Sequence, residues 1–414
     1  MNTAIKCAFA TALALAPVGM LAQDAREAHT FYVCETGNNA NDGLSPKTPK
    51  RNIEKAILAS SDGDTILVAE GTYDGILGSG SIGVRRAVEI RGGYSRDFAV
   101  RDIRDHATVI SPTSRPGMAQ KTPVMTVEVK RGGTKTVIDG LVIDGGNMTA
   151  YCVPDSQVRR PDGVKTPRMA AHGTCGAGGP DLKVNGIITR EQPLIFIGGG
   201  TADVTIRNCA FINAPSNAIM GVAAGRLTVE NNIFVNCRLS AMAVRSAKPD
   251  GANAIEFSNN TTVFIWASAA GAQDAGCAIT LLPGTSYNLR GNIFALCATA
   301  AIDLRESGDH LAGSIIINNV FADNAKGDIA LEDRKSPFVN CSRMAALKWI
   351  KGGDGNEAAQ SLQIFGANID HPYANGFLAL TLDAAPKTMY ANRYDRHAAM
   401  LLWGAVKGRG AQRP

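Results

Sequence analysis

One long segment of the sequence, residues 145–183, gathers side chains that bind anions or transfer protons. It has no periodic apolar run and contains four prolines; irregular segments of this length are usually functional or disordered. Between residues 151 and 183, five Lys or Arg and three Asp give an excess charge of 5 − 3 = +2. The alternative is a solvated loop without chemistry. The candidates for substrate binding are Arg159, Arg160, Lys165 and Arg168, and those for proton transfer are Tyr151 and His172.

Four further charged residues lie in or directly after short apolar runs: Arg245, Asp303, Arg305 and Glu332. β-Elimination on a uronate needs a cation or metal to neutralise the carboxylate, and a base to remove the C5 proton. Arg245 and Arg305 are therefore catalytic candidates as well. Hydrolysis needs a pair of carboxylates instead. Asp303 and Glu332 lie one repeat apart and could form such a pair; both are also candidates for substrate binding. The competing interpretation is a surface salt bridge between Arg305 and Glu332.

These positions belong to a motif that is repeated five times between Asp203 and Asp333. Each copy has an apolar run, a polar residue, an Asn or Gly, a second apolar run and then a third short one. Periods of about 20 to 50 residues indicate repeat architectures, and short alternating runs indicate strands. Asn and Gly tolerate left-handed backbone, so they mark a bend where stacked amides can form hydrogen-bonded ladders. The five bend positions are Asn208, Asn231, Asn259, Gly291 and Asn318.

The third strands predict one shared outer face. Aligning them on Ile219, Met242, Ile279, Ile302 and Ile329 gives two outward columns, because strand side chains alternate. Segment 145–183 lies between a second and a third strand, so we expect it to lean over this face. The first column holds Met220, Ala243, Thr280, Asp303 and Ala330, and the second holds Val222, Arg245, Leu282, Arg305 and Glu332.

With these repeats, the chain resembles the right-handed parallel β-helix of the pectate-lyase-like superfamily over most of its length. The resemblance implies an all-β, single-stranded right-handed parallel β-helix, and a secreted protein that acts on or adheres to polysaccharides. Residues 30–75, with "GDTI" and "GTY", are similar to the opening module of bacterial β-helix proteins. The Arg-containing motif of pectate lyases and the "DPHD" motif of alginate epimerases are not recognisable in the sequence.

The sequence divides into four parts. Residues 1–22 read as a signal peptide, with Lys6 before the apolar run "CAFATALALA". Residues 23–75 predict a strand and a short capping helix with an apolar stripe at Ile53, Ala56 and Ile57. Residues 76–336 are the expected β-helix with the 145–183 insertion, and residues 337–414 are expected to cap the C-terminal end. No later apolar run reaches the roughly 18 residues of a membrane span.

Eight cysteines follow residue 22, and an even count in an exported chain permits disulfides. Cys152 and Cys175, both inside the insertion, are the expected pair. Cys237 and Cys297 lie at equivalent positions two coils apart, roughly 10 Å by strand spacing, which is too far for a bond. We expect them to be small core residues.

The sequence thus predicts an exported, monomeric β-helix protein that binds an acidic polysaccharide, with β-elimination as the activity to test. The alternative is a non-catalytic surface or structural β-helix protein of the adhesin type. A formal charge of +5 − 1 = +4 after residue 22 is compatible with an anionic ligand. No nucleic-acid motif, phosphate loop or zinc spacing is recognisable. Which polysaccharide binds, and whether a metal is needed, stay open.

Overall fold

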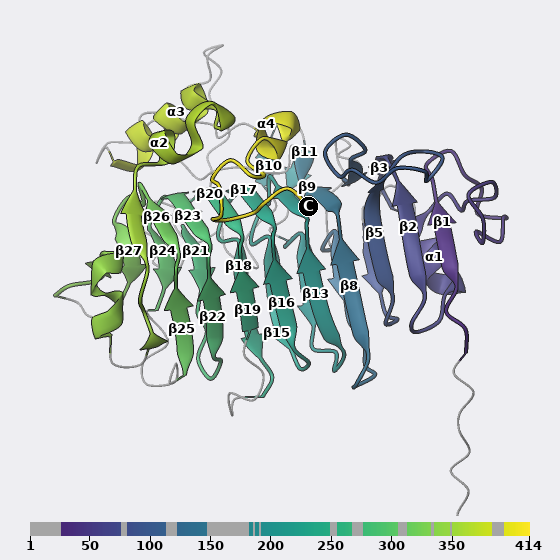
Figure 1. Ribbon diagram of the computed structural model, residues 1–414, viewed down its shortest axis with the longest axis horizontal. Coiled ribbons are helices and arrows are strands. Elements are labelled where there is room, and N and C mark those ends of the chain that lie inside the picture. Colours follow the sequence, from purple (N-terminus) through teal and green to yellow (C-terminus); the bar gives the residue numbers. More distant parts are fainter. Residues whose placement is uncertain are drawn as a thin grey trace, which may run out of the picture.

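The structure is a computed structural model, and it shows three long sheets of mainly parallel strands wound into a solenoid (Figure 1). Each coil passes through sheet A, sheet B and sheet C in that order. The residues that it describes are 26–75, 81–112, 122–146, 182–184, 187–189, 192–248, 255–266, 276–304, 313–332, 335–347, 350–382 and 393–414.

Sheet A has ten strands: β1 (Thr30–Val33), β2 (Thr65–Ala69), β5 (Glu89–Tyr94), β8 (Lys135–Asp139), β13 (Asp203–Arg207), β16 (Leu227–Glu230), β19 (Ile255–Ser258), β22 (Tyr287–Arg290), β25 (Ser314–Ile317) and β29 (Ile350–Gly352). Sheet B has nine: β3 (Gly71–Tyr73), β6 (Thr108–Ile110), β9 (Leu141–Asp144), β14 (Ala210–Ile212), β17 (Ile233–Cys237), β20 (Thr261–Ile265), β23 (Ile293–Cys297), β26 (Val320–Ala322) and β30 (Glu357–Ala359).

Sheet C has eight parallel strands and a ninth, β28, that pairs antiparallel at its end. They are β4 (Ile82–Val84), β7 (Met125–Val127), β12 (Ile195–Gly198), β15 (Ile219–Ala223), β18 (Met242–Ser246), β21 (Cys277–Thr280), β24 (Ala300–Asp303), β27 (Gly327–Ala330) and β28 (Phe338–Val339). A separate antiparallel hairpin joins β10 (Leu182–Val184) to β11 (Ile187–Thr189).

The interior of the solenoid, between the three sheets, is filled by apolar side chains. The short helix α1 (Ile53–Ala59) contributes side chains to this core at the N-terminal end. Its predicted stripe of Ile53, Ala56 and Ile57 is buried in this core. A row of phenylalanine rings runs from coil to coil, and neighbouring ring centroids lie 4.7 to 6.3 Å apart. Burying each ring contributes about 1.5–3 kcal/mol to stability, so each coil is stabilised by the coils stacked on it. The row consists of Phe211, Phe234, Phe257, Phe294 and Phe321.

The bend between sheets A and B confirms the repeat that the sequence predicts. The four anchor asparagines, Asn208, Asn231, Asn259 and Asn318, have φ between 51° and 55°, and Gly291 has φ 64°. The residue before each anchor pairs with its counterpart in the next coil, so the anchors form one column.

The amide ladder, however, is made by the residue after each anchor. The Asn260 side chain donates to the Val229 carbonyl and to Asn292 Oδ1, at 2.9 and 3.2 Å, and its Oδ1 accepts from the backbone and the side chain of Asn232. Among the anchors, Asn231 donates to Asn208 at 2.7 Å. A left-handed residue turns its own side chain outward and its neighbour inward, so the neighbour meets the buried carbonyls. The ladder runs through Asn232, Asn260, Asn292, Asn319 and Asn356.

The C-terminal region does less capping than the sequence predicts. The 3-10 helix η4 (Cys341–Ala346) contributes Cys341 and Met344 to the end of the core. The parts that follow lie along the outer face of sheet B and bury it in a second apolar cluster, which includes Phe377 and Trp403. They comprise α2 (Ser361–Phe365), η5 (Gly366–Asn368), α3 (His371–Leu382), α4 (Arg396–Met400) and the last residues.

Side-chain amides fix this C-terminal segment to the solenoid. Asn213 accepts from the Tyr394 N–H and donates to its carbonyl, at 2.7 and 3.2 Å. Asn231 does the same with Gln412, at 2.7 and 3.0 Å. Each pair imitates the two backbone hydrogen bonds of a neighbouring strand, so the segment is held in register.

The described cysteines are buried and form no disulfide with one another. Cys237 and Cys297 align through Ile265 on the strand between them, two coils apart, as the repeat spacing predicts. Burial raises the pKa of the Cys237 thiol, so it stays protonated and acts as a small core residue. Cys152 and Cys175 lie outside the described residues. Their disulfide stays a prediction, to be checked by mass mapping of non-reduced peptides.

Candidate functional site

The three outer faces of the solenoid differ in what covers them. Sheet B is covered by the C-terminal segment, so its outer face is part of a core. Sheet A presents charged side chains that pair with one another. The sequence predicts sheet C as the binding surface and predicts that the insertion leans over it.

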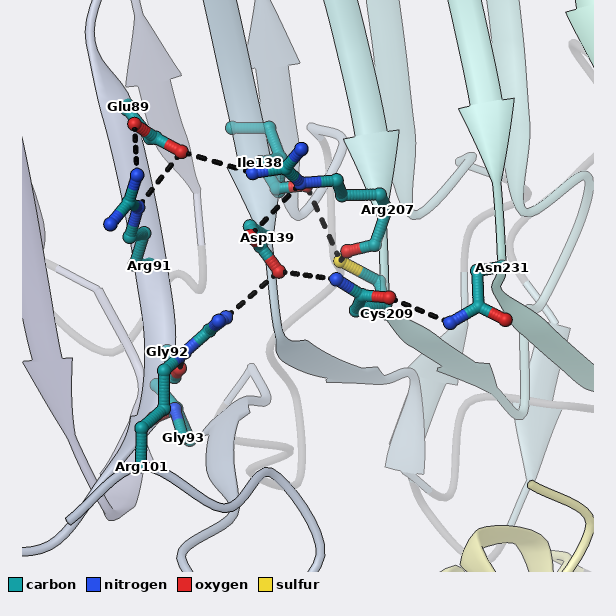
Figure 2. A network of polar contacts seen from close by, with 12 residues as sticks. Glu89, Arg91, Gly92, Gly93, Arg101, Ile138, Asp139, Arg207, Cys209 and Asn231 are labelled. Carbon is teal, nitrogen blue, oxygen red and sulfur yellow. Dashed lines mark hydrogen bonds and ion pairs between the residues drawn. The ribbon is translucent and has the colours of Figure 1, made fainter. Parts of the chain in front are cut away.

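Asp139 is the centre of the ion-pair network on sheet A (Figure 2). Its side chain is 3% exposed and accepts from Arg101 at 2.8 Å, Arg207 at 3.0 Å and Asn208 at 2.8 Å. Burial alone raises the pKa of Asp139, but the hydrogen bonds from Asn208 and Arg101 and the two arginine charges outweigh it and hold it below its ordinary value. The carboxylate is buried and binds three side chains of the protein itself, so this network stabilises the fold rather than offering a ligand site.

A second pair of contacts completes the network. Glu89 binds Arg91 at 2.8 Å and Arg207 at 3.3 Å. The row from Arg91 through Asp139 and Arg207 to Glu230 alternates in charge along the solenoid axis. Opposite charges directly across parallel strands attract, and here they leave little charge for a partner.

The outer face of sheet C has the register that the sequence predicts. Ile219, Met242, Ile279, Ile302 and Ile329 pair in one row. Phe196 pairs with Met220, and Met220 with Ala243, as one outward column; Val222 pairs with Arg245 in the other.

This face joins an apolar surface to a cation. Met220 is 38% exposed, and Phe196 and Val222 are half-buried. Arg245 is exposed, and its guanidinium forms no ion pair or hydrogen bond with any of the described residues. Phe196 was not among the site residues predicted from the sequence. The signal was present in "LIFIGG", where Phe196 alternates with the inward Ile195 and Ile197.

Two other predicted site residues, Asp303 and Glu332, differ in how exposed they are. Asp303 stands in register with Thr280 and Ala330, but it is 4% exposed rather than open to a ligand. Glu332 is exposed. Because Asp303 is buried, it does not form with Glu332 the open pair of carboxylates that hydrolysis would need. Strand alternation predicted which side of the sheet the residue faces, but not what lies over it.

The insertion leaves sheet B after Asp144 and the chain re-enters sheet C at Ile195, as the register predicts. Asp144, fully buried, fixes the exit by accepting from the Gly146 N–H at 2.8 Å and from Asn213 at 2.9 Å. Its other oxygen accepts from Arg393 at 2.8 Å, which ties the exit to the C-terminal segment. The remaining predicted site residues, Tyr151, Arg159, Arg160, Lys165, Arg168, His172 and Arg305, lie outside the described residues.

Within the described ranges, no group of three or more His, Cys, Asp or Glu is arranged to hold a metal ion. No helix in the same ranges is long and apolar enough to cross a bilayer.

Two family models match the sequence. One, described as "Right handed beta helix region", matches residues 193–344. The other, described as "Protein of unknown function (DUF1565)", matches residues 35–142. Together with the parallel sheets, the first match shows that the fold is a right-handed parallel β-helix, with few helices. No match was found among curated proteins.

Three similar solved structures are XylC in complex with xylose, the pectate lyase Pel9A, and a native GH136 lacto-N-biosidase from Eubacterium ramulus. Their identities to this chain are 11%, 11% and 12%, and their TM-scores 0.33, 0.34 and 0.35. The matches cover 73%, 80% and 80% of this chain and 63%, 77% and 67% of those chains. This chain thus spans 63% of the length of XylC. Likeness at this level does not indicate shared chemistry.

Proposed function

We propose that the protein binds an acidic polysaccharide along the outer face of sheet C, beside the insertion. The observation that carries this is Arg245, an exposed cation without a partner among the described residues, on a face that neither the C-terminal segment nor an ion-pair network occupies. A guanidinium binds a carboxylate through two parallel hydrogen bonds, so one uronate carboxylate satisfies it.

The apolar neighbours of Arg245 support a sugar ligand. Phe196, Met220 and Val222 offer an apolar surface on which the C–H face of a pyranose ring can pack, and binding sites commonly join such a surface to a few polar groups. Successive strands lie about 4.8 Å apart, which is close to the length of one sugar unit. A polymer lying along the axis would therefore present one unit to each coil.

The proposal extends to the insertion and to export. Arg159, Arg160, Lys165 and Arg168 would add cations at the side of the face, and residues 1–22 would direct the chain out of the cytoplasm. If the protein also cleaves, Tyr151 or His172 would serve as the base, while Arg245 and Arg305 neutralise the uronate carboxylate.

Affinity electrophoresis in gels containing polygalacturonate or alginate tests the binding proposal. Arg245→Ala should lose most of the retardation, and Arg245→Lys should keep part of it because a lysine acts as a point charge. Arg290→Ala, on sheet A, is the matched control because it removes the same charge from another face. Equal retardation of wild type and all three variants would contradict the proposal. Ultraviolet absorbance of unsaturated uronates in the same mixtures reports β-elimination, and N-terminal sequencing of the secreted protein reports export.

A further inference from the structure

A polar cavity of about 520 Å³ lies at the N-terminal end of sheet B, around β3 and the residues that follow β6. Its wall includes Glu35 and Asn52 from the first turns, Thr72 and Tyr73 from β3, and Ser111. This volume falls within the range of small-molecule sites. Neither the ion-pair network of sheet A nor the outer face of sheet C contributes to it.

Glu35 is held in place as an acceptor. Its Oε2 accepts from the Thr72 N–H at 3.0 Å, and its Oε1 accepts from Arg96 at 3.1 Å. Gly71 makes this possible: its φ is 143°, and a Cβ there would lie 2.7 Å from Glu35 Oε2. A carboxylate has about four acceptor positions, so two remain for a ligand.

The cavity also has polar groups that the protein does not use. The guanidinium of Arg51, the side-chain Nδ2 of Asn52 and the hydroxyls of Thr72 and Ser111 make no hydrogen bond within the described residues. Asn52 is oriented all the same, because its Oδ1 accepts from Asn39. Glu35 and Asn52 are thus already oriented, and further donors and acceptors line the same cavity, which suits a ligand with many hydroxyl groups.

Charged groups of both signs line the site. Glu35 is paired with Arg96, and the cavity wall adds one further carboxylate, Asp74, and one further cation, Arg51. Its hydrogen-bond donors and acceptors therefore favour a neutral polyhydroxylated ligand over one that needs a single sign of charge. The buried ring of Tyr73 gives the wall an apolar element.

We infer that this cavity is a second carbohydrate site, which binds a neutral sugar through hydrogen bonds to Glu35, Asn52, Thr72 and Ser111. It does not depend on polyanion binding at sheet C. A protein with both sites would hold a neutral branch or chain end at its N-terminal coils while the acidic chain lies along sheet C.

The test is titration of the full-length protein with lactose, cellobiose and galacturonate. Saturation-transfer NMR detects binding, and calorimetry measures the affinity. The neutral disaccharides should bind, and Thr72→Val and Ser111→Ala should each weaken them about 3- to 10-fold, as expected for one lost hydrogen bond. Thr65→Val, the same isosteric change on the neighbouring sheet A strand β2, should bind like wild type.

Three outcomes would overturn the inference: no binding of either neutral disaccharide up to its solubility limit, equal affinity in wild type and both cavity variants, or preference for galacturonate. Arg245→Ala separates the two proposals. It should lose polygalacturonate retardation yet keep lactose or cellobiose affinity, so either site can fail without the other.

Discussion

The outer face of sheet A and the bend that follows it use their polar groups internally, whereas the outer face of sheet C leaves the guanidinium of Arg245 open. Asp139 is surrounded by Arg101, Arg207 and Asn208, while Arg245 has no partner among the described residues. The same solenoid thus carries one face whose charges stabilise the fold and another whose charge is available to a ligand. Substitutions should separate the two by their effect on stability and on binding.

The largest loss of stability should come from the buried amide ladder. Asn260→Leu removes a side chain that makes four hydrogen bonds, so buried carbonyl and amide groups lose their partners. We expect the free energy of unfolding to fall by about 3–5 kcal/mol, from several unsatisfied groups at once. Asn259→Leu, one residue earlier and exposed, should cost about 1–2 kcal/mol through its left-handed backbone. Urea denaturation of both variants checks this, and equal losses would contradict the assignment of the ladder.

Asp139→Ala should come next. It leaves Arg101 and Arg207 without their shared carboxylate, and breaking such a half-buried pair should cost about 2–4 kcal/mol. Glu256→Ala, on β19 of the same sheet, is the control and should stay within about 0.5 kcal/mol. If the two variants unfold at the same urea concentration, the network contributes nothing beyond its surface charge.

The pH dependence of stability should follow from the same carboxylate. The pKa of Asp139 is lower in the folded protein than its ordinary value of about 3.9, so its stabilisation is fully present above that pH. It is lost as pH falls through the depressed folded value. Wild type should therefore lose stability below about pH 4 more steeply than Asp139→Asn, which has no proton to take up there. Parallel urea profiles of the two proteins between pH 5 and about 2.5 would rule out this contribution.

The sequence predicted the parts of the fold that repeat. The bend positions and the rows of sheet C follow from a motif written five times, and the structure confirms the register of both. The amide ladder, which includes Asn232 and Asn260, lies one residue after the bend positions where the sequence predicted it. The doublets "NN" and "GN" at the bends indicate this second position.

What the sequence did not predict depends on contacts between distant segments. Gly410 donates to the Gly291 carbonyl at 2.8 Å, a contact that no local period encodes, and through such contacts the C-terminal segment covers sheet B. The burial of Asp303 was not predicted either, because alternation gives the side of the strand that a residue faces but not how exposed it is. The cavity at Glu35 likewise joins residues from separate turns and strands.

The smallest effect on stability should come from Arg245→Ala. Its guanidinium has no partner among the described residues, so the free energy of unfolding should stay within about 0.5 kcal/mol of wild type. Arg207→Ala, on sheet A, should be clearly less stable because it breaks contacts to Asp139 and Glu89. Binding should show the reverse order: Arg207→Ala keeps polygalacturonate retardation and Arg245→Ala loses it. Because exposed charges are screened beyond about 8 Å at physiological ionic strength, added salt should weaken wild type more than Arg245→Ala. A salt dependence that is the same in both proteins would place the polyanion contact elsewhere than on sheet C.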